Sequence, residues 1–305
     1  MLGIEEIGFY IPAMRISNYQ RKEQFGIDDY FIQEKIGIKQ VAVKGSDEDT
    51  SDLCVKAFDE LCSKKAIDRR EIEAVVVVTQ NPDRNIPHVS AMVHGALNLP
   101  SQCACFDISL GCSGFVYTLS VFQAFMEANG MKKGLLFTAD PYSKVVDPND
   151  KNTSLLFGDA AAVTLISDRP RLTSGKFTFG TIGTEHDKLI CNDGVLFMNG
   201  RAVFNFAAKT VPGDIQLMAT KNDLKLEEID KFLFHQGSKI IVETIADKLA
   251  IPRTKAPYLI YDYGNTVSST LPILLAGELC GKAKTIAICG FGVGLSWASG
   301  LLKRV

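Results

Sequence analysis

The sequence lacks a dominant charge and a long apolar run, and we expect no basic, apolar leader. Its 33 Lys and Arg residues nearly balance 35 Asp and Glu residues, which gives a net charge of −2 over 305 residues. No overall basic field therefore exists to hold a nucleic-acid backbone. No apolar run reaches the roughly 20 residues that span a bilayer, and the opening segment Met1-Leu2-Gly3-Ile4 is followed at once by acids. We expect no nucleic-acid and no membrane partner.

The chain also lacks the cysteine and histidine spacing of a zinc site. Its eight cysteines sit mostly inside apolar runs, which fits a protein that stays reduced in the cytoplasm. Cys103 and Cys105 would share one face of a strand, but no second Cys or His pair with zinc-like spacing follows. The sequence therefore predicts a cytoplasmic protein without a bound metal.

The composition is that of an ordinary globular protein, with 46% hydrophobic and 22% charged residues, and a chain of this size can bury roughly 75% of its unfolded surface. Short β-branched runs alternate with helical patterns, which predicts an α/β fold. A helix is expected from Ser51 to Lys64, with its apolar residues towards one face. Strands are expected at residues 74–79, 104–108, 134–138, 162–166, 231–234, 258–261 and 285–289.

The two halves of the chain repeat the same order of elements. Each half has a strand after a charged turn, then a small polar elbow before an apolar helix, then another strand. The landmarks are Val78, Cys112 and Phe137 in the first half and Phe234, Asn265 and Ala287 in the second. Their gaps are 34 and 25 residues in the first half and 31 and 22 in the second. We predict two copies of one α/β unit, residues 1–168 and 169–305, joined at the polar, Pro-containing segment 167–171.

Cys112 stands in Gly111-Cys112-Ser113-Gly114, where an apolar helix is expected to begin. A thiol at a helix N-terminus meets the positive end of the helix dipole and unpaired N–H groups, so we expect a lowered pKa and an available thiolate. The flanking glycines allow a tight turn and the close approach of a substrate carbonyl. A buried structural cysteine is the alternative that the residues alone leave open.

Two polar residues end expected strands in the second half. His235 follows the strand at 231–234, and Asn265 lies in the elbow Tyr263-Gly264-Asn265-Thr266. Each has a structural alternative, a hydrogen-bonded histidine and a helix N-cap. The repeat favours a functional interpretation, because it brings Cys112, His235 and Asn265 to the carboxyl edges of strands, where α/β sheets bind their ligands.

The segment Gly290-Phe291-Gly292-Val293-Gly294 follows the last expected strand and has the glycines of a dinucleotide fingerprint. No βαβ unit and no downstream acidic residue follow it, so this interpretation is weak. A backbone loop that binds an oxyanion suits the segment better.

Taken together, these segments resemble the β-ketoacyl-acyl carrier protein synthase III family, condensing enzymes with the thiolase fold. The resemblance covers essentially the whole chain and implies two pseudo-symmetric α/β halves in an α-β-α-β-α arrangement. The similar segments are residues 106–115, 147–150, 157–162, 198–207, 235–236, 264–266 and 290–297.

The resemblance implies a decarboxylative Claisen condensation that needs no permanently bound cofactor. Cys112 would take an acyl group from an acyl-coenzyme A thioester. His235 and Asn265 would then hold the carbonyl oxygen of a malonyl thioester on acyl carrier protein while its carboxylate leaves as CO2. The amides of Cys112 and of the loop with Gly292 and Val293 would hold the oxyanion of the condensation step. Val293 replaces a glycine usual in the family, although its amide donor remains.

The resemblance also implies binding residues by position. Contacts to coenzyme A or pantetheine are expected from Phe31, Lys35, Lys151 and Ser238. Candidates for the acyl pocket are Leu156, Phe157, Phe206 and, from the second subunit of an expected homodimer, Ile86. Candidates for a patch that binds the acidic carrier protein are Lys239, Lys248, Arg253 and Lys255, although a solvated helix face explains them equally well.

The segment after His235 departs from the family pattern. The fatty-acid enzymes read His-Gln-Ala-Asn with an arginine two positions on, whereas this chain has Ser238 for the asparagine and Ile240 for the arginine. A starter enzyme of fatty-acid synthesis and a paralogue in a dedicated or secondary-metabolite pathway therefore both stay open. Two other functions also stay open: an acyltransferase that passes the acyl group from Cys112 to a hydroxyl or amine, and a non-catalytic subunit that binds a carrier protein.

Overall fold

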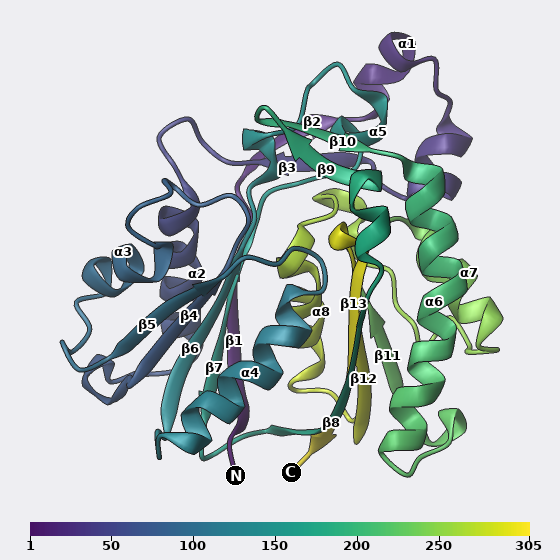
Figure 1. Cartoon of the computed structure of the whole chain (residues 1–305). Helices are drawn as coiled ribbons and strands as arrows, with labels where there is room; N and C mark the ends of the chain where they lie inside the picture. The colour runs from purple at the N-terminus through teal and green to yellow at the C-terminus, as the bar shows by residue number, and fades with distance from the viewer.

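The computed structural model describes all 305 residues and is built around nine strands in the order β11-β12-β13-β8-β1-β7-β6-β4-β5 (Figure 1). The strands of the first half are β1 (Gly3–Tyr10), β4 (Ala74–Val78), β5 (Ala104–Ile108), β6 (Lys133–Ala139) and β7 (Ala161–Ser167). Those of the second half are β8 (Leu172–Thr181), β11 (Lys231–Phe234), β12 (Thr285–Gly292) and β13 (Ser296–Arg304). Two small two-stranded sheets lie outside this sheet and are formed by β2 (Met14–Ser17) with β3 (Gln40–Val43) and by β9 (Leu189–Asn192) with β10 (Val195–Met198).

The pairing pattern of the first half is repeated in the second. β4 is parallel to β6, which is antiparallel to β7, which is antiparallel to β1. In the second half β11, β12, β13 and β8 pair in the same order and with the same directions. The halves meet where β1 pairs with β8 through only two residue pairs. The α/β fold and its internal repeat are therefore confirmed.

One expected strand does not form. Residues 258–261 match β5 of the first half by position, but they contain no strand and enter a 3-10 helix, Ile260–Asp262. Their polar groups bond outside the sheet: the Tyr258 hydroxyl donates to the carbonyl of Ile36, and the Leu259 N–H donates to Oε1 of Gln236. Tertiary contacts therefore override the strand propensity of this segment.

The helices and the strands of the sheet are stacked in five layers. The helices are α1 (Lys22–Phe25), α2 (Thr50–Lys64), α3 (Val89–Ala96), α4 (Gly114–Ala128), α5 (Lys151–Ser154), α6 (Gly200–Lys221), α7 (Lys239–Lys248) and α8 (Thr270–Glu278). On β4, Val75 and Val77 pack with α2 and α3, whereas Val76 and Val78 pack with α4 and α8. β12 alternates in the same way between α4 with α8 and α6 with α7. Figure 1 shows α4 and α8 between the strands of the two halves, which completes the α-β-α-β-α arrangement.

The long helix α2 matches its expected bounds within one residue. Asp49 caps its start, and a reciprocal bond between Asp52 and the Asp49 N–H completes a capping box. No helix of the protein is both long enough and apolar enough to cross a membrane.

Candidate active site

A cavity of about 380 Å³ brings the side chains of Cys112, His235 and Asn265 together. Cys112 follows β5 and precedes α4, His235 directly follows β11, and Asn265 precedes the turn into α8. Each residue therefore lies where a parallel strand ends or a helix begins, at the edge where α/β sheets bind ligands. The three side chains that the sequence repeat predicts to converge therefore do lie together in the fold.

The elbow around Cys112 is packed against the end of β12. A Cβ atom on Gly292, where φ is +156°, would lie 2.8 Å from the Cys112 Sγ, and one on Gly290 would lie 2.6 Å from the Cys112 carbonyl oxygen. Only glycine fits at these two points, because any larger residue would displace the thiol or its backbone. Gly290 and Gly292 thus allow the 290–294 segment to pack directly against Cys112.

Cys112 is buried, with 4% of its surface exposed. Burial raises its pKa to about 12, although the Val293 N–H, which is directed at the sulfur, acts in the opposite direction. The expected lowering of this pKa by the helix N-terminus is therefore wrong, because desolvation outweighs it. The resting side chain is a neutral thiol.

His235 is fully buried, and burial lowers its pKa to about 3, so the imidazole is neutral. Its Nδ1 lies 2.7 Å from the Thr270 hydroxyl at the start of α8. The ring of Phe291 meets it edge to face, with centroids 5.5 Å apart. These contacts leave Nε2 as the ring nitrogen available to the cavity.

Asn265 is held from both sides by backbone groups. Its N–H donates to the Leu156 carbonyl at 2.8 Å, and its carbonyl accepts from the Gly158 N–H at 3.0 Å. The side-chain Oδ1 accepts from the Val267 N–H at 2.9 Å, as in an Asx-turn. Because Oδ1 is engaged, the amide donor Nδ2 is the end that is available to the cavity.

A pair of serines fixes the loop between β12 and β13. The Ser296 hydroxyl donates to the Val293 carbonyl at 2.9 Å and lies 2.7 Å from the hydroxyl of Ser113. Ser113 is the N-cap residue of α4, directly after Cys112. The two hydroxyls therefore connect the Cys112 elbow to the loop whose N–H points at the thiol.

Comparisons with known proteins identify the family of this chain. Family models for 3-oxoacyl-[acyl-carrier-protein (ACP)] synthase III and for its C-terminal part match residues 106–183 and 219–304. The β-ketoacyl-[acyl-carrier-protein] synthase III of Streptococcus mutans is 33% identical in an alignment of 324 positions that covers 98% of each chain. This chain belongs to the synthase III family.

Solved synthase III structures have the same fold along the whole chain. One 3-oxoacyl-(acyl-carrier-protein) synthase III superposes with a TM-score of 0.92 at 30% identity, covering 100% of this chain and 99% of the other. The synthase III of Aquifex aeolicus superposes with a TM-score of 0.93 at 26% identity and covers 100% of both chains.

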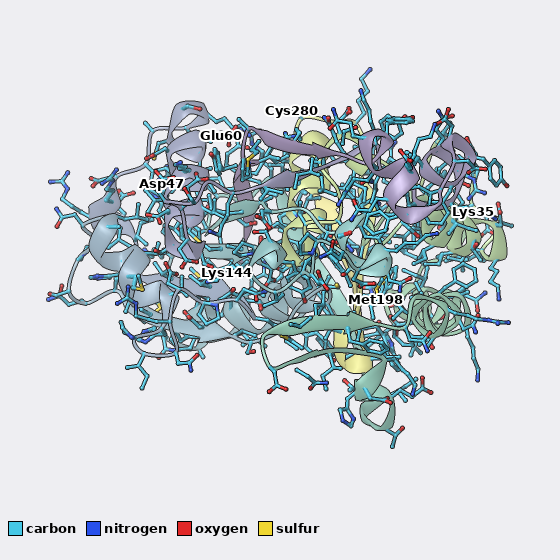
Figure 2. All side chains as sticks on the ribbon, turned by 90° about the horizontal axis from the view of Figure 1, so that it is seen from above. Lys35, Asp47, Glu60, Lys144, Met198 and Cys280 are labelled. Atoms are coloured by element: carbon cyan, nitrogen blue, oxygen red, sulfur yellow. The ribbon has the colours of Figure 1, made fainter.

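Several binding residues expected from the synthase III resemblance line the cavity. The residues that line the cavity include Phe31, Lys35, Ser238, Leu156 and Phe157. Viewed from above, the N-terminal segment that carries Lys35 lies over the second half, and Lys35 and Met198 are both on that side of the molecule (Figure 2). This segment and α7 are in contact, so the cavity wall is built from both halves.

Three expected residues lie outside the cavity lining. Lys151 is adjacent, since its Nζ lies 5.1 Å from the centre of the Phe31 ring. Phe206 is buried in the core and packs against Trp297. Ile86 is 85% exposed in the single chain.

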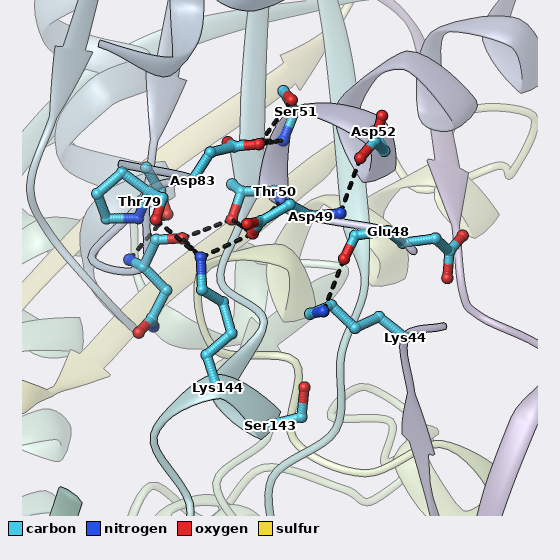
Figure 3. A network of polar contacts seen from close by, with 12 residues as sticks. Lys44, Glu48, Asp49, Thr50, Ser51, Asp52, Thr79, Asp83, Ser143 and Lys144 are labelled. Atoms are coloured by element: carbon cyan, nitrogen blue, oxygen red, sulfur yellow. Dashed lines mark hydrogen bonds and ion pairs between the residues drawn. The ribbon is translucent and has the colours of Figure 1, made fainter. Parts of the chain in front are cut away.

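The loop that carries Ile86 is held by a polar network (Figure 3). Lys144 donates to Asp49 at 2.7 Å and to the Pro82 carbonyl at 2.8 Å, while the Ser51 hydroxyl donates to Asp83 at 2.7 Å. Residues 81–83 are thereby tied to the start of α2. The exposed Ile86 side chain is presented from an anchored loop.

The four basic residues expected to form a carrier-protein patch are separated. Lys239 is close to the cavity and bonds to Glu34 at 2.7 Å. Lys255 lies at the other end of β11, because its carbonyl accepts from the Phe232 N–H. Arg253 bonds to Asp247 near the far end of α7. Lys248 is the last residue of that helix.

Sequence reasoning missed two buried residues beside Cys112. Asp140 follows β6 and accepts from the Gln80 N–H at 2.7 Å and from the Ser268 hydroxyl. Tyr142 packs on Phe157, with ring centres 4.8 Å apart, and its hydroxyl donates to Oε1 of Gln80 at 3.2 Å. The signal that was present for Asp140 is its place as a polar residue directly after a strand, the same signal that identified His235.

Proposed function

We propose that this protein is a β-ketoacyl-acyl carrier protein synthase III that condenses an acyl thioester with a malonyl thioester. The observation that carries the proposal is the convergence of a thiol, a neutral imidazole and a carboxamide in one cavity. The family membership of nearly the whole chain supports the same reaction.

In the first step Cys112 attacks the carbonyl of an acyl-coenzyme A. The new bond joins Sγ to the acyl carbon, the thioester bond to coenzyme A breaks, and the thiol proton leaves with the coenzyme A sulfur. Because the resting thiol is neutral, the attack depends on stabilisation of the tetrahedral oxyanion. We assign that role to the N–H groups of Cys112 and Val293, which are fixed before charge develops.

In the second step a malonyl thioester loses its carboxylate as CO2. The electron pair of the broken C–C bond forms an enolate, whose oxygen His235 and Asn265 stabilise by hydrogen bonds. The carbanion then attacks the acyl carbon on Cys112 and expels the thiolate, which takes a proton to restore the resting enzyme. The product is a 3-oxoacyl thioester, two carbons longer than the acyl group.

We assign pantetheine binding to Phe31, Lys35, Ser238 and the neighbouring Lys151. Leu156 and Phe157 are assigned to the acyl end of the cavity. We propose acyl carrier protein as the carrier of the malonyl group, with Lys239 as the part of the expected basic patch that lies nearest the cavity.

Intact mass spectrometry after incubation with acyl-coenzyme A thioesters of increasing length tests the first step. We expect a mass gain of one acyl group that is absent in Cys112→Ala. Malonyl-carrier and malonyl-coenzyme A are then added, and CO2 and the 3-oxoacyl product are measured. Product formed only with a hydroxyl or amine acceptor, or an adduct that persists in Cys112→Ala, would overturn the proposal.

We also propose a homodimer in which β5 of one chain pairs with β5 of a second copy. β5 is the edge strand of the sheet and all five of its residues are half-buried. Val121 on α4 is 47% exposed, and Phe179 on β8, whose ring packs on that of Tyr117 of α4, is 46% exposed. A second copy would cover these apolar side chains and the free strand edge, and Ile86 would reach the partner's acyl pocket.

Sedimentation equilibrium tests the dimer. We expect a mass twice that of the 33.3 kDa chain, and a shift to the monomer in Val121→Lys. Leu217→Lys is the matched control, because Leu217 is similarly exposed, at 58%, but lies on α6. Monomeric wild-type protein, or equal dissociation by both variants, would contradict the arrangement.

A further inference from the structure

The hydrogen bonds around His235 determine which of its ring nitrogens carries the proton. A neutral imidazole has one N–H donor and one acceptor nitrogen, and the partner of one nitrogen sets the role of the other. Nδ1 has a single partner, the Thr270 hydroxyl at 2.7 Å. Thr270 is 1% exposed, so water does not compete for this contact.

The Thr270 hydroxyl has one proton and two neighbouring acceptors. They are Nδ1 of His235 and, at 2.9 Å, the Val267 carbonyl. The Val267 carbonyl already accepts the backbone N–H of Thr270. The hydroxyl proton can therefore point at Nδ1, the nearer acceptor, without leaving a buried carbonyl unpaired.

We propose that Thr270 is a positioning residue that donates to Nδ1 of His235 and so keeps the proton on Nε2. His235 then presents an N–H donor to the cavity. A bare Nε2 would instead point a lone pair at the carbonyl oxygen of the second thioester. The catalytic consequence rests on the proposed condensing function, whereas the protonation state itself does not.

The same turn orients both donors of the second step. The Val267 N–H engages Oδ1 of Asn265 and frees Nδ2, while the neighbouring Thr270 hydroxyl engages Nδ1 of His235 and frees Nε2. Val267 has φ of +53°, a left-handed conformation that a β-branched residue adopts only under constraint.

Hydroxyl groups on the two following residues supply that constraint. Ser268 donates to buried Asp140, and Ser269 donates to the Thr138 carbonyl at 3.0 Å. The turn is thus bonded to β6 and its end, which fixes the position of Thr270 relative to the His235 ring.

Nitrogen-15 NMR of protein labelled at histidine tests the protonation state directly. The chain has only four histidines, and the spectrum of His235→Asn assigns the resonances of His235 by their loss. We expect the shift and coupling pattern of an imidazole protonated at Nε2 in the wild-type protein. The pattern of an Nδ1-protonated ring would overturn the proposal, whatever the activity.

A kinetic comparison then tests the consequence. In Thr270→Val the donor is lost while the shape is kept, and in Thr270→Ser the donor remains. We expect decarboxylation of the malonyl thioester to fall about 10- to 100-fold more than Cys112 acylation in Thr270→Val, since one preorganised donor is disturbed. Thr270→Ser should restore the ratio of the two rates to within about threefold of wild type.

Equal losses of acylation and decarboxylation in Thr270→Val would indicate a merely structural role and overturn the proposal. Failure of Thr270→Ser to restore the ratio would do the same. If the wild-type protein forms no 3-oxoacyl product, the proposed function fails, but the NMR spectrum still decides the state of His235. If Thr270→Val does not fold, the wild-type spectrum and Thr270→Ser remain decisive.

Discussion

The hydroxyls of Ser113 and Ser296 lie 2.7 Å apart in the buried interior, although 183 residues separate them in the chain. One belongs to the start of α4 in the first half and the other to the start of β13 in the second. The contact therefore bonds the elbow around Cys112 to the loop that carries the Val293 N–H.

Ser296→Ala should slow the acylation of Cys112. The substitution removes the hydrogen bond to the Val293 carbonyl, so the Val293 N–H is no longer held in place, and we expect roughly a tenfold fall in the acylation rate. Stopped-flow release of coenzyme A measures this rate. Ser113→Ala is the matched control, because it keeps the Ser296 bond to Val293. A larger effect in Ser113→Ala than in Ser296→Ala would show that this assignment is incorrect.

Tyr142→Leu should change the acyl-chain preference. Tyr142 backs Phe157, which lines the cavity, so a smaller side chain leaves space for a longer acyl group. We expect kcat/KM for acyl thioesters one or two carbons longer to rise roughly tenfold relative to the shortest substrate. Tyr142→Phe keeps the ring but loses the bond to Gln80, and its preference should match wild type. The same shift in both variants would argue against a steric cause.

Ile240→Arg should strengthen the interaction with an acidic carrier protein. Ile240 lines the cavity at the start of α7, where Lys239 bonds to Glu34. An exposed charge at this rim contributes about 1 kcal/mol at most, so we expect a two- to fivefold lower KM for malonyl-carrier substrate at low salt. KM for malonyl-coenzyme A and the variant Ile240→Gln serve as controls. An unchanged KM for the carrier substrate would place its docking elsewhere.

Asp140→Asn should alter the pH dependence of stability. Burial raises the pKa of Asp140 to about 6, although hydrogen bonds from Gln80 and Ser268 lower it in part. The folded state thus binds this proton more tightly than the unfolded chain, and stability is lost as pH rises from about 4 to about 6. Between pH 4 and pH 7 the free energy of unfolding of the variant should gain up to about 3 kcal/mol relative to wild type.

Urea unfolding at both pH values measures this difference for Asp140→Asn. Asp230→Asn provides a contrast of opposite sign, because the N–H groups of Thr285 and Lys284 hold the pKa of Asp230 below its usual value. Above about pH 4 this stabilising contribution is fully present, so the variant should be less stable than wild type by a nearly constant amount between pH 4 and pH 7. A difference between Asp140→Asn and wild type that does not change with pH would contradict the buried ionisation.

The fold was predictable where a strand consists of apolar residues alone. β4 is such a strand, and its five residues are all buried. β1 was not identified, because Glu5 and Glu6 interrupt its apolar pattern. In the folded chain both acids are buried and bond to Lys65 and Arg171. Sequence patterns do not reveal these partners, since they come from distant segments.

The candidate site, like the fold, was predictable only in part from the sequence. A strand pattern precedes, or a helix pattern follows, each of Cys112, His235 and Asn265. The local structure at these positions does not require a polar residue, so its presence indicates a function. Thr270 and Ser296 carry no such signal, because serine and threonine are ordinary at helix starts and loops. Their roles arise from contacts across the fold, which only the tertiary structure provides.

The repeated pairing of the two halves has a consequence for the side chains that their elbows can carry. Two identical subunits related by a twofold axis would carry the same side chain at both elbows. In a single chain that contains both halves, the elbow of the first half carries a thiol at Cys112 and that of the second carries an amide at Asn265. Covalent fusion of two similar units thus permits an asymmetric site, with the thiol on one side and the imidazole and carboxamide on the other.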